Sequence, residues 1–290
     1  MTKDPETNEF MMIVYFADKG DLRSDLSNNF NNILWKDKIF WLQFISRHLR
    51  DLHKLGYFHK DFHSGNILRT IEYGNDLSYI SDFGLSGPAD EQKSDDKVYG
   101  VLPYIAPEVL NGELYTSSSD IYSLGVVMAE LSSGKPPFYN KKHNLNLALA
   151  ICNGLRPEFG KGTPDFYKKL AYKCMDANSN ERPTANELKD IFLFWYKSDS
   201  GSEHYQEEES FGYKRKEIIA AFEEADKEIP NISTSYEKES DAVYTSRAFT
   251  FSNLLPKPIN SSIITSYIND EENHEGIFYF LFYILYLMIT

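Results

Sequence analysis

Apolar positions along residues 10–196 recur with the periods of short strands and long helices. Residues 10–16 form an apolar run with the length and composition of a strand. Between residues 36 and 55 apolar side chains return every three or four positions, which predicts a long helix with one buried face, ended by Gly56. Residues 117–133 are apolar on most sides, which predicts a helix that is buried all round.

The rest of this region predicts further helices and one small hairpin. Helical patterns lie near residues 142–153, 164–176 and 184–196, and residues 67–80 have the pattern of a β-hairpin. Residues 82–108 are polar and without a clear period, so we expect a mobile loop there. Together these elements predict an α+β fold that is mainly helical, with short β-hairpins.

The composition changes after residue 196. Residues 197–290 hold 8 Lys and Arg against 17 Asp and Glu, and large apolar residues become sparse. We therefore expect residues 197–276 to be a disordered acidic tail. Within it, residues 216–229 have a helical pattern that would suit docking. The apolar face of this helix would carry Ile218, Phe222, Ala225 and Ile229.

Residues 277–290 are an apolar segment in which six of the 14 residues are aromatic. As a helix this segment would be about 21 Å long, against roughly 30 Å of hydrocarbon in a bilayer. Three interpretations remain open: translated non-coding sequence, a marginal membrane anchor, or a segment that is buried or docks on a partner. The short length disfavours the membrane.

Charge and cysteine content narrow the class of protein. A net charge of −13 disfavours a nucleic-acid surface, which requires a basic stripe. Only two cysteines, Cys152 and Cys174, are present, so a disulfide framework is excluded and a reducing compartment is expected. Residues 1–9 form a polar stub without the apolar core of a signal peptide. We expect a cytoplasmic protein; no pattern indicates its oligomeric state.

The chemistry is concentrated in residues 57–68 and the short motif that follows the hairpin. The first stretch carries Asp61 and, five residues later, Asn66; the second is Asp82-Phe83-Gly84. Two carboxylates and an amide oxygen can hold a metal–phosphate group, and one carboxylate can accept a proton from an attacking hydroxyl.

Three more motifs follow in a fixed order. They are Ala106-Pro-Glu108, Asp120-Ile-Tyr-Ser-Leu-Gly125 and Glu181-Arg-Pro183. With the two motifs above, they make residues 10–196 resemble the C-terminal lobe of a eukaryotic protein kinase, closest to the tyrosine-kinase-like serine/threonine group. The resemblance implies ATP and Mg²⁺ as cofactors and a protein hydroxyl as the acceptor, Ser or Thr rather than Tyr.

The resemblance also implies catalytic and nucleotide-binding roles. Asp61 would be the catalytic base, and Asn66 and Asp82 would ligate the Mg²⁺ that bridges the ATP phosphates. Residues 14–17 would be the interlobe hinge. On the adenine side, the implied residues are Val14 at the pocket, the backbones of Tyr15 and Ala17, and Leu68 as the floor.

Further residues would support this site. Phe83 would pack under His59, Asp120 would hydrogen-bond the catalytic-loop backbone, and Glu108 would form a buried ion pair with Arg182. Each has a plainer alternative: His59 as an ordinary packed histidine, Asp120 as a helix N-cap, and the last two as unrelated surface charges.

Some positions depart from the family pattern. Lys60 stands where the family usually has an arginine that grips a phosphorylated activation loop, and a lysine lacks the bidentate fork. His63 and Val101 replace the lysine and threonine usual in serine/threonine kinases, although Tyr104 favours that class. Control by activation-loop phosphorylation is therefore in doubt.

The largest departure concerns the N-terminal lobe. A complete kinase needs a Gly-rich loop and a lysine–glutamate pair on the phosphates, yet the sequence contains no G-x-G-x-x-G. We expect the N-terminal lobe to be largely missing and the chain as written to be inactive. The alternative is a truncated pseudokinase that acts as a scaffold or decoy. The expected partner is a protein substrate or scaffold partner, and not a nucleic acid.

Overall fold

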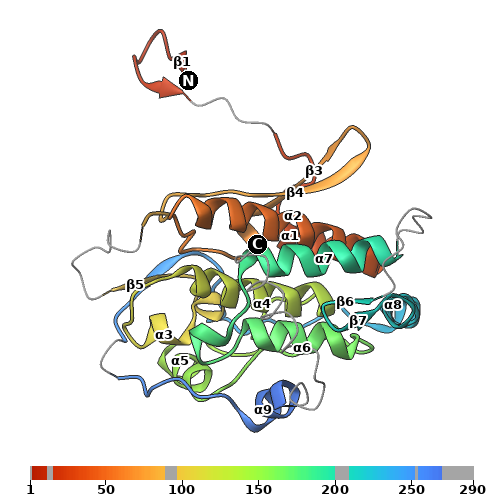
Figure 1. The fold of residues 1–290 in the computed structure, drawn as a ribbon. Helices are drawn as coiled ribbons and strands as arrows, with labels where there is room; N and C mark the ends of the chain where they lie inside the picture. The colour runs from red at the N-terminus through yellow and green to blue at the C-terminus, as the bar shows by residue number, and fades with distance from the viewer. Residues whose placement is uncertain (1, 12–15, 89–96, 200–208, 252–253, 270–290) are drawn as a thin grey trace, which may run out of the picture.

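Helices are the main regular elements of the structure (Figure 1), a computed structural model that describes residues 2–11, 16–88, 97–199, 209–251 and 254–269. The helices are α1 (Leu22–Asn29), α2 (Trp35–Lys54), α3 (Pro107–Leu110), α4 (Ser117–Ser133), α5 (Leu145–Cys152), α6 (Asp165–Cys174), α7 (Ala185–Asp199), α8 (Arg215–Glu228) and α9 (Ser262–Asn269). Short 3-10 turns lie at Phe30–Asn32, Ser64–Asn66, Leu102–Tyr104, Ser179–Glu181 and Ile229–Asn231.

The strands form short antiparallel pairs. They are β1 (Thr2–Lys3) with β2 (Phe10–Met11), β3 (Ile67–Glu72) with β4 (Asn75–Ile80), β5 (Val98–Gly100) with β8 (Arg247–Phe249), and β6 (Glu209–Ser210) with β7 (Tyr213–Lys214). This is the α+β fold that the sequence predicted, because helices dominate and the strands occur as isolated pairs.

The helix α2 buries the face that its sequence period predicted. Its central apolar residues Ile39, Leu42, Ile45 and Leu49 are fully buried, and α7 runs alongside it (Figure 1). Leu55, assigned to the same face, is 75% exposed because the helix ends at Lys54. The long helix therefore forms a rigid support directly before the loop that carries Asp61.

The helix α4 is buried all round, as its composition predicted. Nearly every side chain from Ser119 to Ser132 is buried. Gly125 permits a close approach to the end of α6, since a Cβ atom there would lie 2.7 Å from Cγ of Met175 and 2.9 Å from Cβ of Cys174. The helix ends at Gly134, which has a φ of +69°. A central helix without a solvent face cannot shift independently of the core.

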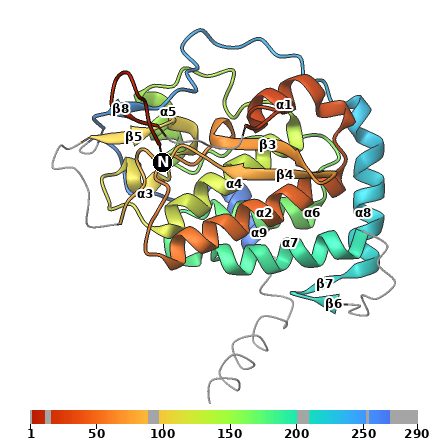
Figure 2. The ribbon, with the colours of Figure 1, turned by 90° about the horizontal axis from the view of Figure 1, so that it is seen from above.

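The β3–β4 hairpin lies across α1 and α2 (Figure 2) and is tied to both by Arg69. This fully buried guanidinium lies 3.0 Å from the Asp25 carboxylate of α1 and stacks 3.2 Å from the ring centroid of Trp41 in α2. The hairpin register places Ile67 opposite Ile80. Residues that precede β3 and follow β4 are thereby brought side by side.

Residues 97–108 differ from the mobile loop that their polarity predicted. They form β5, a 3-10 turn and α3, and Leu102, Tyr104 and Ala106 are buried. Apolar residues are frequent between residues 98 and 107, and most of them are buried in the core. The order of this segment therefore comes from tertiary contacts and not from a local period. Residues 89–96 lie outside the described residues.

The segment beyond residue 196 also differs from its prediction as a disordered tail. Helix α8 packs on the lobe through Ile218, Phe222 and Ala225, which are 1–2% exposed. Phe222 stacks on Trp35 with ring centroids 5.9 Å apart, and Asp226 accepts the backbone N–H of Trp35 at 2.8 Å. Although the segment has few large apolar residues, those of α8 lie on the one face that packs against the lobe.

The apolar segment 277–290 lies outside the described residues. Across the helices that the structure does describe, none is both long enough and apolar enough to cross a bilayer.

We predict that Phe222→Ala lowers the free energy of unfolding by about 3 kcal/mol or more, because a buried aromatic ring leaves a cavity when removed. Glu223→Ala is the matched control, since Glu223 is the next residue of α8 and is exposed. Urea unfolding of the purified chain measures both. Equal stability of the two variants would mean that α8 does not dock.

We predict that stability rises with pH between about pH 7 and pH 9 because of Lys38. Its ammonium is fully buried over the rings of Phe30 and Trp35, and burial lowers its pKa to about 7. In that window the unfolded chain binds a proton that the folded chain does not, with a slope of up to about 1.4 kcal/mol per pH unit.

Lys38→Met should therefore stabilise the protein at neutral pH and flatten this slope. Lys54→Met, at an exposed position of the same helix, should leave the slope unchanged. Denaturant unfolding at several pH values measures the slope, and a slope that survives Lys38→Met would contradict the assignment.

Candidate active site

The loop that carries Asp61 is held from below by Asp120, a fully buried residue of α4. One carboxylate oxygen of Asp120 accepts the backbone N–H of His59 at 2.9 Å, and the other accepts that of Lys60 at 3.2 Å. Lys60 has a φ of +65°, a strained conformation that these hydrogen bonds stabilise. The N-cap of α4 is Thr116, so Asp120 serves the loop and not the helix end.

His59 links the loop to the motif after the hairpin. Its Nε2 lies 2.9 Å from the carbonyl oxygen of Ser81, and its Nδ1 accepts the backbone N–H of Asp61 at 3.4 Å. These two contacts fit a neutral ring with its proton on Nε2. The ring also packs against Phe83, with centroids 5.3 Å apart. A displacement of the loop that carries His59 would therefore also displace the segment that carries Ser81 and Phe83.

The Asp61 side chain is the buried carboxylate of the site. It is 7% exposed, and within the described residues its Oδ1 atom has no hydrogen-bond partner. Burial raises the pKa of Asp61, an interaction with the Ser246 side chain opposes that increase, and the negative charge of Asp82 adds to it. Its backbone oxygen accepts the side-chain amide of Asn66 at 3.0 Å.

Asn66 and Asp82 meet at the open end of the hairpin. The backbone N–H of Ser81 donates to the carbonyl oxygen of Asn66 at 2.8 Å, which places Asp82 one residue from this contact. Asp82 is exposed and has a φ of +60°, and its carboxylate accepts the backbone N–H of Gly84 at 3.3 Å. The structure thus brings together Asp61, Asn66 and Asp82 from two separate sequence motifs.

These oxygens suit a hard divalent cation. Two carboxylates that repel each other, one with an unpartnered buried oxygen, would be stabilised by a positive ion between them. No cluster of three or more His, Cys, Asp or Glu able to hold a metal occurs in the part of the chain that is described. Mg²⁺ would therefore complete its shell with phosphate oxygens and water, as it does in nucleotide sites.

The predicted adenine-binding residues are only partly placed. Val14 and Tyr15 lie outside the described residues. Ala17 is half-buried, and its carbonyl oxygen accepts the N–H of Gly20 at 3.2 Å. Leu68 is half-buried in β3 and bridges to Asp21 at the start of α1. The adenine pocket thus remains a prediction.

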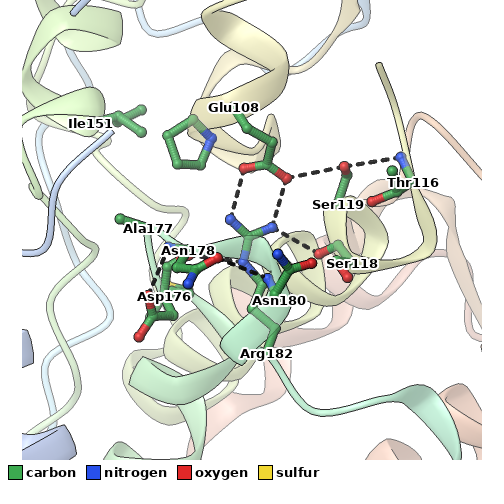
Figure 3. Close-up of polar contacts among 12 residues, drawn as sticks. Glu108, Thr116, Ser118, Ser119, Ile151, Asp176, Ala177, Asn178, Asn180 and Arg182 are labelled. Atoms are coloured by element: carbon green, nitrogen blue, oxygen red, sulfur yellow. Dashed lines mark hydrogen bonds and ion pairs between the residues drawn. The ribbon is translucent and has the colours of Figure 1, made fainter. Parts of the chain in front are cut away.

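Glu108 and Arg182 form a buried, bidentate ion pair behind the site (Figure 3). Both N–H···O distances are 2.7 Å. Ser119 donates to the same carboxylate at 3.1 Å, while the guanidinium also donates to the carbonyl oxygens of Asp176 and Ser118. The pair joins α3 to α4 and to the segment before α7, so these charges are structural and not unrelated surface groups.

Lys60, where the family pattern has an arginine, binds the end of the segment that follows the Asp82 motif. Its ammonium donates to the carbonyl oxygen of Pro88 at 2.7 Å, at the last described residue before 89–96. His63, at the other departure from the family pattern, is buried 3.8 Å from Asp61 Oδ1. Burial lowers the pKa of His63 to about 3, and the positive charge of Arg23 contributes, so His63 is neutral near pH 7.

Two residues near the site were missed by sequence reasoning. Arg23 of α1 donates to the Ser64 hydroxyl at 3.1 Å, three residues after Asp61. Ser246, from the supposed tail, interacts with Asp61. Arg23 lies in a polar helix and Ser246 in an acidic segment, and neither belongs to a motif that could have identified it.

The chain is similar to known protein kinases. Residues 2–192 match the family model described as protein tyrosine and serine/threonine kinase. A probable serine/threonine-protein kinase of Dictyostelium discoideum is 31% identical over 180 residues, which cover 62% of this chain and 11% of the relative.

Two further relatives come from the same organism. The RGS domain-containing serine/threonine-protein kinase A is 28% identical over 61% of this chain and 15% of its own length. A probable LIM domain-containing serine/threonine-protein kinase is 28% identical over 59% of this chain and 17% of its own length. The chain thus spans between 11% and 17% of these relatives.

We predict that Arg182→Met and Glu108→Gln each destabilise the protein by about 3–5 kcal/mol, because each leaves its partner buried without an opposite charge. The double variant should cost less than the sum of the two. Lys142→Met is the control, since its ion pair with Asp241 is more than half exposed at both ends and should matter little. Thermal and urea unfolding of the unmodified chain and these four variants measure the coupling; strictly additive losses would argue against a coupled pair.

Proposed function

Because the chain belongs to the protein tyrosine and serine/threonine kinase family, we propose that it transfers the γ-phosphoryl group of ATP to serine and threonine hydroxyls of proteins. The observation that carries this proposal is the convergence of Asp61, Asn66 and Asp82 at the end of the hairpin. Serine and threonine are favoured over tyrosine because the relatives above are serine/threonine-protein kinases.

Asp61 has the environment of a general base. Its buried carboxylate has a raised pKa and an oxygen that is open to a donor, so it can hydrogen-bond an attacking hydroxyl and accept its proton. Asn66 and Asp82 would hold Mg²⁺, which when bound with ATP supplies the reactive phosphoryl group and neutralises its charge. The amide of Asn66 also anchors the Asp61 backbone, so the base and the metal ligand keep a fixed spacing.

Nucleotide binding extends this proposal to the hinge. Val14, Tyr15, Ala17 and Leu68 would contact adenine, and the linked pair of His59 and Phe83 would keep the loop aligned with Asp82. A protein substrate would approach from the side of β5, and an acidic chain does not suit nucleic acid. We place this activity in the cytoplasm.

We also infer that residues 1–290 by themselves transfer phosphate slowly or not at all. They contain no G-x-G-x-x-G to cover the phosphates, and positioning supplies most of the rate in phosphoryl transfer. The same feature favours the second candidate function, a non-catalytic scaffold or decoy that offers its substrate face to partner proteins.

We predict that Asp61→Asn lowers phosphotransfer at least about a hundredfold while the thermal shift produced by Mg-ATP remains, because the base contributes to chemistry more than to binding. Asp82→Asn should instead remove the Mg²⁺-dependent part of that shift. Both readouts are taken on the purified 290-residue chain and on the protein isolated from its source, with Lys54→Met as control.

Transfer by the isolated protein that survives Asp61→Asn would overturn the assignment of the base. If neither form transfers phosphate or is stabilised by Mg-ATP, the scaffold function replaces the kinase function.

A further inference from the structure

Residues 236–251 run from the end of α8 back to β5, and β8 lies beside β5 (Figure 2). The chain is fixed before it reaches the site. Tyr236 packs on Tyr139 with ring centroids 4.8 Å apart, and Glu239 N–H donates to the Tyr139 carbonyl oxygen at 2.9 Å. Ala242 is fully buried. The segment is therefore docked, although its sequence is polar.

Tyr244 anchors the segment beside the catalytic loop. The Arg23 guanidinium donates to the carbonyl oxygen of Tyr244 at 3.1 Å and stacks 4.9 Å from the centroid of the Tyr244 ring. The Tyr244 hydroxyl donates to the Pro137 carbonyl oxygen at 2.8 Å. The ring of His143 meets it edge-on at 4.9 Å. Arg23 also binds Ser64 of the catalytic-loop region, so one guanidinium joins the two segments.

After Ser246 the chain adds a strand to the edge of β5. Arg247 pairs with Gly100, Ala248 with Tyr99, and Phe249 with Val98, all antiparallel. Phe249 is 6% exposed and enters the core, whereas Ala248 is exposed. Strand addition of this kind is a common way to bind an extended peptide, with backbone pairing for affinity and alternate side chains for specificity.

This pairing delivers Ser246 to the candidate base. Gly100, the partner of Arg247, lies against Asp61, since a Cβ atom at Gly100 would be 3.4 Å from Asp61 Oδ1. The Ser246 side chain interacts with the same carboxylate. Ser246 itself is exposed, so it contributes no packing that would explain its position.

We propose that residues 243–249 occupy, within their own chain, the site where a protein substrate binds, with Ser246 in the position of the phosphate-accepting residue. The inference rests on the proposed function, because it takes Asp61 as the group that faces the acceptor. A purely structural cover would need only the buried Ala242 and Phe249; it would not need a hydroxyl beside an incompletely paired, buried carboxylate.

The geometry also defines the class of peptide that this site takes. The peptide is extended, pairs with the β5 edge, and has a small hydroxyl residue facing Asp61. An aromatic or apolar residue three positions later fills the place of Phe249. Because the chain's own segment is tethered, its effective concentration is in the millimolar range, so it excludes weaker peptides in trans.

The test uses a fluorescein-labelled peptide of residues 240–251 as the probe, measured by fluorescence anisotropy without nucleotide. Ala248→Pro should release the tethered segment, because proline removes a strand N–H at an exposed position while every packed side chain stays. Thr250→Ala is the matched control, exposed and just beyond β8. Circular dichroism checks the fold, and Arg247→Ala replaces Ala248→Pro if that variant is unfolded.

We expect the probe to bind the released variant at least tenfold more tightly than the unmodified chain or Thr250→Ala. A probe with alanine in place of Ser246 should bind the released variant several-fold more weakly, because this probe loses the contact with Asp61. Equal affinity of the released and unmodified chains would overturn occupancy of the site, and equal affinity of the two probes would overturn the acceptor position.

These outcomes are distinct from those of the phosphotransfer assay. A released variant that binds the serine probe but transfers no phosphate would count against the proposed function and leave the peptide site in place. If the protein transfers phosphate but the released variant does not bind the probe, the proposed function stands and the peptide site is overturned.

Discussion

The buried carboxylate of Asp120 is the interaction on which the site depends. It accepts the backbone N–H groups of His59 and Lys60, and the second of these residues has a positive φ. A buried carboxylate is costly unless it is fully hydrogen-bonded, and a strained loop persists only when its surroundings hold it. Each therefore stabilises the other. Because α4 is buried on every side, Asp120 holds the loop of His59 and Lys60 in a fixed position relative to the core.

The candidate active site is assembled from this fixed point outward. His59 connects the loop to Ser81 and Phe83, while the β3–β4 register sets Asn66 beside Ser81. The result is two carboxylates close enough for Asp82 to raise the pKa of Asp61. Uncompensated repulsion between two neighbouring carboxylates, one of them buried, costs stability, which is typical of sites that bind a cation or handle a proton.

The acidic segment after α7 packs against the same lobe. Helix α8 packs on Trp35 of α2. Strand β8 pairs with β5, which carries Gly100. Docking of this segment thus links the part of the lobe where α8 packs to the part that carries Gly100 and Asp61. Regulation of the lobe through this segment would not require phosphorylation of residues 82–108, in keeping with a lysine at position 60.

The sequence by itself determined the elements whose burial is local, and the order of the chemical motifs. The face of α2, the buried α4, and the spacing of Asp61, Asn66 and Asp82 could all be predicted, because a helix period or a motif is written in neighbouring residues. The periods also located α8, with its apolar face, but not its docking onto Trp35.

Only the tertiary structure decided what lies around Asp61. The order of residues 97–108, the clamp by Arg23 and the approach of Ser246 depend on pairing between segments far apart in the chain. Such pairing is selected by complementary surfaces once the core has formed. A segment whose buried residues follow neither a helix period nor a strand period therefore gives no local pattern by which its place could be predicted.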